Sequence, residues 1–122
     1  LVWELVIRVV GKLVLICKFK KKMWMDMTLN KRTKWEERKY EAIYWRKCYK
    51  LNSWFQDNLE ESDSYYRVVS IDKLKELLIV LPTLVEEDWY FSEYRMKETQ
   101  LAIEKEIKFS TDSVEFLYDM NC

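Results

Sequence analysis

Apolar positions are most regular between about residues 34 and 58 of the chain. Thr33 stands three residues before Glu36, which is the spacing of a capping box at a helix start. From Tyr40 to Phe55, apolar and aromatic side chains then recur at intervals of three or four residues, the period of one helix face. The sequence therefore predicts a long helix over residues 34–58.

Two later segments show the same period. Ser70 is a suitable N-cap for the segment IDKLKELLIVL, so we expect a second helix over residues 71–81. A third helix is expected over residues 89–108. Its expected apolar stripe comprises Tyr90, Tyr94, Leu101, Ile103 or Glu104, and Ile107. If the three helices pack on one another, the core contains Ile43, Leu51, Trp54, Phe55, Leu74, Leu77, Leu78, Leu101 and Ile107.

β-branched and aromatic side chains are concentrated in two short runs, residues 65–69 and 114–118. Such residues are favoured on a pleated, half-buried surface, so we expect the two runs to pair as strands. Residues 23–34 are polar to mixed in character and are expected to form a connection.

Residues 1–22 are the most apolar part of the chain, and three interpretations of them stay open. The β-branched side chains on both sides of Gly11 favour a hairpin. Glu4, Arg8 and Lys12 lie four residues apart and would form the polar stripe of an amphipathic helix. The same charges argue against a spanning helix, which needs about 20 largely uncharged residues, so a membrane partner is not expected. A helix on the membrane surface is a third option.

We expect one small globular domain over residues 31–122, because a chain of 122 residues is within the usual size of a single domain. The expected fold class is α+β and predominantly helical, with three main helices and a small β component of two to four strands. Residues 1–30 form a separate N-terminal segment, either hairpin or amphipathic helix. The chain begins with Leu1, and the methionines of residues 23–27 are candidate translation starts. With such a start, the preceding residues lie outside the native gene.

One glycine, one proline and no histidine limit both the fold and the chemistry. Tight hairpin turns favour glycine at positive φ, so few are expected and helices are favoured. Without histidine, the chain lacks the usual general base near neutral pH and the commonest metal ligand, and one glycine cannot build a glycine-rich phosphate loop. The carboxylate runs at 60–63 and 86–88 lack calcium-loop spacing and are interpreted as solvated loop charges. We therefore expect no metal, no cofactor and no enzymatic activity.

The three cysteines are Cys17, Cys48 and Cys122. Their odd number and the lack of any C-x-x-C pair indicate neither a disulfide framework nor a zinc site. We interpret them as reduced thiols of a cytosolic protein. Lys47 and Lys50 beside Cys48 would lower the pKa of its thiol, whereas burial on the predicted helix would make it an inert small residue.

The net charge is zero, but the two halves of the chain are opposite in charge. Residues 1–50 carry 14 Lys and Arg against 5 Asp and Glu, whereas residues 51–122 carry 7 against 16. A basic half can mark an anionic partner. Alternatively, the two halves pack together within one domain and neutralise each other.

Aromatic and basic side chains are interleaved in residues 40–55. Single-stranded nucleic-acid binders use this mixture, because aromatic faces stack on bases and cations contact phosphates. The alternative is a half-buried core helix whose Lys and Arg stems cover apolar surface. The candidate binding surface comprises Tyr44, Trp45, Arg46, Lys47 and Lys50.

Several segments, in order, resemble a family of small uncharacterised phage and prophage proteins. They are EAIYWRKCYKLNSWFQDN (41–58), which contains a YWRKxxxLxxWF helix motif, then YYRVVSIDKLKELL (65–78), LPT (81–83), DWYFSEYRMKETQLAIEKEI (88–107) and TDSVEFLYDMN (111–121). The chain departs from the family after LPT, where LVEED joins directly to WYF without a glycine-flanked Phe turn. Residues 1–30 have no counterpart in the family.

The resemblance implies a phage or prophage origin and a role in the cytoplasm of an infected or lysogenic bacterium. It supplies no activity, substrate or catalytic residue. Together with the missing catalytic groups, it leads us to expect a non-catalytic accessory protein that binds a host or phage protein. The alternative is an accessory protein that binds single-stranded nucleic acid with the basic, aromatic first half.

Overall fold

The computed structural model describes residues 3–9, 12–17, 25–60 and 66–121. The strands are β1 (Trp3–Val9), β2 (Lys12–Cys17), β3 (Asp26–Thr33), β4 (Tyr40–Arg46), β5 (Tyr66–Val69) and β6 (Val114–Asn121). The α-helices are α1 (Tyr49–Asn58), α2 (Ile71–Val80) and α3 (Glu93–Lys108), and two short 3₁₀ helices are η1 (Leu81–Leu84) and η2 (Trp89–Phe91).

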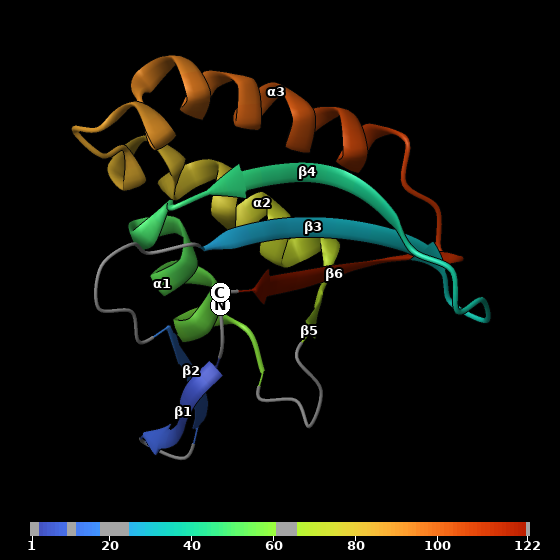
Figure 1. Ribbon diagram of the computed structural model, residues 1–122. Coiled ribbons are helices and arrows are strands. Elements are labelled where there is room, and N and C mark those ends of the chain that lie inside the picture. The colour runs from blue at the N-terminus through green and yellow to red at the C-terminus, as the bar shows by residue number, and fades with distance from the viewer. Residues whose placement is uncertain (1–2, 10–11, 18–24, 61–65, 122) are drawn as a thin grey trace.

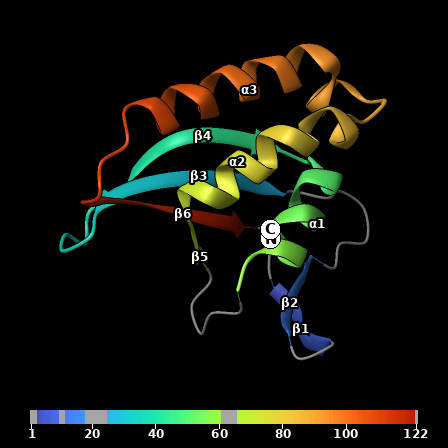
Figure 2. The same ribbon diagram turned by 180° about the vertical axis from the view of Figure 1, so that it is seen from behind.

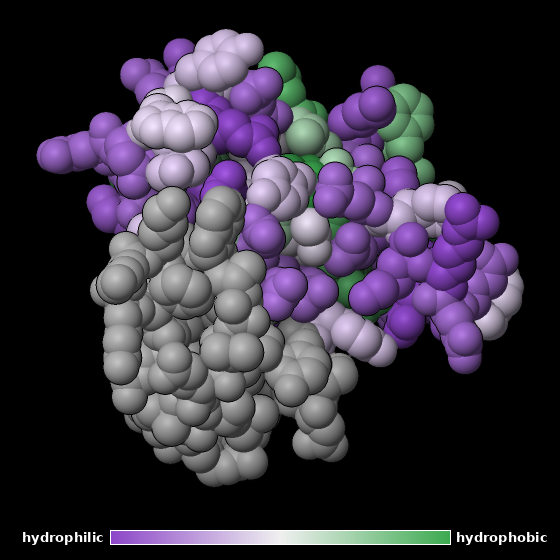
Figure 3. Space-filling view, viewed as in Figure 1, coloured by the Kyte–Doolittle hydropathy of each residue, from purple (hydrophilic) through white to green (hydrophobic). Residues whose placement is uncertain are grey.

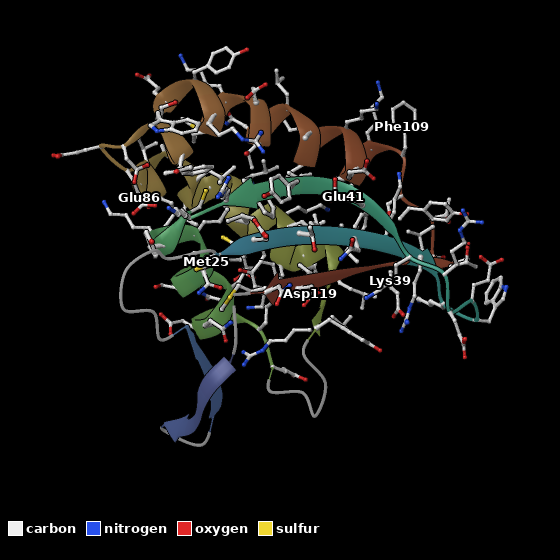
Figure 4. All side chains as sticks on the ribbon, in the orientation of Figure 1. Met25, Lys39, Glu41, Glu86, Phe109 and Asp119 are labelled. Carbon is white, nitrogen blue, oxygen red and sulfur yellow. The ribbon has the colours of Figure 1, made fainter. Side chains whose placement is uncertain are left out.

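Four of the strands form an antiparallel sheet in the order β4-β3-β6-β5. Helices cover one face of this sheet, because α2 lies behind it in Figure 1 and in front of it in Figure 2. In both views α3 runs along β4, which is an edge strand. The opposite face, seen in Figure 3, is mainly hydrophilic where the described residues are coloured. Asp119 of β6 lies on this face (Figure 4).

Alternation along the strands assigns side chains to the two faces. On β3, Met27 and Leu29 are fully buried, whereas Thr28 between them is only partly buried. Cross-strand partners share a face, so Trp45 of β4 lies beside Met27 on the helix-covered side. The buried residues of that side are Met27, Leu29, Ile43, Trp45, Arg67, Val69, Phe116, Tyr118 and Met120.

The core is centred on three aromatic rings from different elements. The Phe55 ring of α1 stacks on the Tyr118 ring of β6 with centroids 3.9 Å apart, and it packs on Trp45 at 5.9 Å. The buried indole Nε1–H of Trp45 donates to the Thr99 hydroxyl of α3 at 2.9 Å. The Tyr118 hydroxyl donates to the Asn52 side chain at 2.5 Å. Each polar atom brought into the core by Trp45 and Tyr118 therefore has a partner.

The fold class is α+β, but the prediction that it is predominantly helical was wrong. A four-stranded antiparallel sheet forms the centre, and the helices cover one face of it. We expected few hairpins because the chain has one glycine. The chain instead joins β3 to β4 through a longer loop, residues 34–39, and Lys47 takes a positive φ of 53° without being glycine.

The predicted helix over residues 34–58 was also wrong in its first half. Residues 26–33, expected to be a connection, form β3, and residues 40–46 form β4, so α1 begins only at Tyr49. Apolar and aromatic residues are dense in residues 40–55, and such a run fits a helical period and a strand period alike. Residues 40–46 form a strand because they pair with β3 over most of their length. Tertiary context of this kind commonly overrides local preference.

Other predicted elements were confirmed. The expected helix over 71–81 is α2, and its N-cap is Ser70, whose hydroxyl accepts from the Lys73 N–H at 3.1 Å. The two predicted strands pair antiparallel as β5 and β6. The third helix ends at Lys108 as expected but begins at Glu93.

Most of the predicted core was also confirmed. Ile43, Leu51, Phe55, Leu74 and Leu77 are buried. Partly buried residues that pack against this core are Trp54, Leu78 and Ile107. Leu101 is the exception, because 67% of it is exposed and α3 buries Met96, Thr99 and Ile103 instead.

The first segment contains an antiparallel pair, β1 with β2, so the hairpin interpretation describes its backbone. The turn between these strands lies outside the described residues, as do residues 18–24.

The two oppositely charged halves of the chain are interleaved in the sheet, where β6 lies beside β3. The Lys31 ammonium is 3.1 Å from the Glu106 carboxylate of α3, and the Arg32 guanidinium is 2.7 Å from the Glu115 carboxylate of β6. Each pair joins a base of the first half to an acid of the second. Within the described residues, mutual neutralisation therefore accounts for part of the charge asymmetry.

Replacement of Thr99 by Val should leave the buried Trp45 indole N–H without its acceptor. We expect Thr99→Val to lower the free energy of unfolding by about 1–3 kcal/mol, measured from the urea midpoint at unchanged slope. Thr111→Val is the control, because the Thr111 hydroxyl is exposed and, among the described residues, its hydrogen-bond partner is the exposed hydroxyl of Ser113. Equal losses in both variants would contradict the structural role of the Trp45–Thr99 bond.

Candidate functional site

The end of β4 and the segment before α3 form a groove along the outer edge of the sheet. Three strongly or partly exposed aromatic side chains, Tyr44, Trp89 and Tyr94, line it. Trp89 is 76% exposed and Tyr94 is 74% exposed, which is unusual for side chains of their size. We call this surface the aromatic groove; its lining residues are Tyr44, Trp45, Arg46, Trp89, Tyr90, Ser92, Tyr94, Arg95 and Glu98.

The segment before α3 is held in place by hydrogen bonds and one buried ring. The Asp88 carboxylate accepts from the Tyr90 N–H at 2.9 Å, and the Ser92 hydroxyl caps α3 by accepting from the Arg95 N–H at 3.3 Å. The fully buried Phe91 ring anchors the segment in the core. Trp89 remains at the surface, where its ring stacks on Tyr90 with centroids 4.3 Å apart.

The edge of β4 faces the groove. In an antiparallel pair, every second residue directs its backbone N–H and C=O toward the partner strand. The Lys47 N–H donates to the Met25 carbonyl at 2.9 Å. Tyr44 is three residues earlier, so its backbone N–H and C=O point away from β3. The Arg95 guanidinium donates to the Tyr44 carbonyl oxygen and lies 3.6 Å from the Glu98 carboxylate. Arg95 therefore joins α3 to the edge strand. It also occupies the Tyr44 carbonyl, a backbone acceptor to which an added strand could otherwise hydrogen-bond.

Charged side chains of both signs surround the groove. The Lys47 ammonium lies 5.2 Å from the centre of the Tyr90 ring, in a cation–π contact. The Glu86 carboxylate accepts from the Tyr49 N–H at 2.9 Å. Burial raises the pKa of Glu86, and the nearby Asp88 carboxylate raises it further. The surface thus combines aromatic rings with mixed charge.

The structure distributes the residues of the predicted binding surface between core and groove. Tyr44 is exposed, and its hydroxyl donates to the Asp26 carboxylate at 2.6 Å, which raises the pKa of Tyr44 to about 12. Trp45 is 1% exposed and belongs to the core. Arg46 lines the groove, and the exposed Lys50 donates to the Val85 carbonyl at 3.3 Å. Lys47 lies over Tyr90, as described above.

Sequence reasoning did not find the half of the groove that comes from the later segment. Tyr90 and Tyr94 were predicted in the apolar stripe of a helix that begins at residue 89. Ser92 was the available signal, since a serine N-cap there starts the helix at Glu93 and leaves Trp89 and Tyr90 in the preceding turn. Only the folded chain brings this turn beside residues 44–47.

The Cys48 thiol is fully buried beside the groove. It lies 3.4 Å from the Arg46 carbonyl and 3.5 Å from the Tyr90 carbonyl. Burial raises the pKa of Cys48 to about 12, because the thiolate would lose its hydration. Of the two expectations for this residue, the inert buried thiol describes the structure.

No group of three or more acidic or cysteine side chains in the described part of the chain could hold a metal ion. Among these same residues, none of the helices combines the length and apolarity needed to cross a membrane. No protein-family model, curated protein or solved structure significantly matches the chain.

The buried Cys48 thiol should resist thiol reagents in the folded protein. With Cys17 and Cys122 replaced by Ser, an exposed thiol of pKa about 8.5 would be half ionised at pH 8.5, whereas Cys48 stays protonated. We expect its reaction with an aromatic disulfide reagent to be at least about 100-fold slower in buffer than in denaturing urea. Equal rates would indicate an accessible thiolate activated by its lysine neighbours.

Proposed function

We propose that this protein is a non-catalytic phage or prophage accessory protein that binds a host or phage protein through the aromatic groove. The resemblance of residues 41–121 to phage and prophage proteins supports this origin and a place of action in the cytoplasm of the infected or lysogenic bacterium. One structural observation carries the choice of surface: Trp89 and Tyr94 expose about three quarters of their area in one groove.

The composition of the groove favours a protein partner. Trp, Tyr and Arg are the residues that most often dominate binding energy at protein interfaces, and all three types line this groove. Mixed charge also fits a protein surface better than a polyanion, because Glu98 lines the groove and Glu86 and Asp88 lie beside it.

Binding of single-stranded nucleic acid is the second candidate. The stacked rings of Trp89 and Tyr90 favour it, since such rings also stack on bases, and Arg46 and Lys47 lie close by. Two other bases of the first half, Lys31 and Arg32, are already paired with carboxylates. The basic first half thus offers fewer unpaired cations for phosphates than the sequence led us to expect.

Capture of the tagged full chain from bacterial lysate, with and without nuclease, tests the proposed function. We expect a discrete, nuclease-resistant partner. Trp89→Ala and Tyr94→Ala should each weaken its capture by at least about 30-fold, the effect of a 2 kcal/mol hot spot. Phe109→Ala is the matched control, because Phe109 is 69% exposed at the other end of α3, far from Glu86 (Figure 4).

Loss of capture in the Phe109 variant, or retention in both groove variants, would contradict the proposed surface. Capture of a partner that is lost after nuclease treatment would favour the second candidate, binding of single-stranded nucleic acid. In that case affinity for an oligonucleotide should fall steeply with salt, with a slope set by the number of phosphates neutralised.

A further inference from the structure

The aromatic groove has an acidic border on the side of the turn that precedes α3. Glu86, Glu87 and Asp88 directly precede Trp89 in the chain. Glu87 and Asp88 are exposed, and neither is paired with a cation in the described part of the chain. Two carboxylates of this run, Glu86 and Asp88, follow burial as the next causes of the raised pKa of Tyr49. This border carries negative charge beside an exposed indole.

The cations around the groove already have contacts within the protein. Arg95 donates to the Tyr44 carbonyl and lies beside Glu98, and the Lys97 ammonium lies 3.6 Å from the Glu93 carboxylate. Lys47 is over the Tyr90 ring and Lys50 donates to the Val85 carbonyl. None of these contacts is with Glu87 or with the ring of Trp89.

The stack of Tyr90 and Trp89 already accepts one cation, the Lys47 ammonium on Tyr90. The ring of Trp89, 76% exposed, belongs to the same stack, and none of the described cations makes such a contact with it. Indole is the side chain that binds cations most strongly on its face, and a planar guanidinium can stack there while it pairs with a carboxylate. An exposed indole that directly follows two carboxylates without a cation partner in the described part of the chain is complementary to arginine.

We propose that the partner enters the aromatic groove with an arginine-bearing segment, whose guanidinium stacks on Trp89 and pairs with Glu87 and Asp88. This rests on the proposed function, since it names the chemistry of the protein that the groove binds. The other class of occupant, single-stranded nucleic acid, is repelled by the same carboxylates.

The test uses the full chain and a labelled short peptide of alternating Gly and Arg, with both ends blocked. The same peptide with citrulline, a neutral isostere of arginine, is its reference. We expect the arginine peptide to bind at least about tenfold more tightly, and either Trp89→Leu or the double variant Glu87→Gln, Asp88→Asn to remove that difference. Asn at position 88 keeps a side-chain acceptor for the Tyr90 N–H, so the turn should persist.

The matched control is the double variant Glu104→Gln, Asp112→Asn, which removes two exposed carboxylates that do not line the groove. It should leave arginine-peptide binding unchanged. Equal binding of the arginine and citrulline peptides, or equal loss in the control, would overturn the inference. Tighter binding of a short oligothymidine that Trp89→Leu abolishes would overturn it in favour of nucleic acid.

Capture of the partner separates this inference from the proposed function. If Trp89→Ala abolishes capture while the Glu87, Asp88 double variant retains it fully, the groove binds a protein. In that case the inference that the partner inserts an arginine is refuted. If Trp89→Ala leaves capture unchanged, the proposed function itself fails.

Discussion

Burial of the Trp45 indole is the constraint on which both the core and the surface depend. The ring packs on Phe55 of α1 and its N–H donates to Thr99 of α3, so one side chain joins the sheet to two helices. Because neighbouring strand residues face opposite sides, the same burial turns Tyr44 outward. The backbone of Tyr44 then lies at the open edge of β4, where Arg95 of α3 reaches it.

Attachment of α3 to β4 brings two distant parts of the chain together. The first turn of α3 and the turn before it carry Trp89, Tyr90 and Tyr94, and these lie beside the last residues of β4. In the turn before α3, Phe91 is fully buried and anchors the segment, whereas Trp89, two residues earlier, is 76% exposed. The groove is therefore a consequence of how the core is packed, and its residues need not be contiguous in the sequence.

The sequence predicted α2, the pairing of β5 with β6, and the end of α3, because each has a local signal such as the Ser70 cap. It did not predict β3 and β4, since the aromatic run of β4 also fits a helical period, no glycine marks the loop of residues 34–39 between them, and β3 pairs on its other side with the distant β6. Of the predicted surface, Tyr44 and Arg46 line the groove and Lys47 lies over its Tyr90 ring. Trp45 also borders the groove but is 1% exposed and belongs to the core, and Lys50 is not among the lining residues. Trp89 and Tyr94 join Tyr44 and Arg46 only through tertiary packing.

Hydroxyl-radical footprinting of the full chain, alone and bound to its captured partner, tests the central claim most directly. Trp35 is the internal reference, because it is exposed to the same 76% as Trp89 but lies in the loop between β3 and β4. Our account predicts that binding protects Trp89 and Tyr94 from oxidation several-fold and leaves Trp35 unchanged. Protection of Trp35 with Trp89 and Tyr94 still fully oxidised would contradict it.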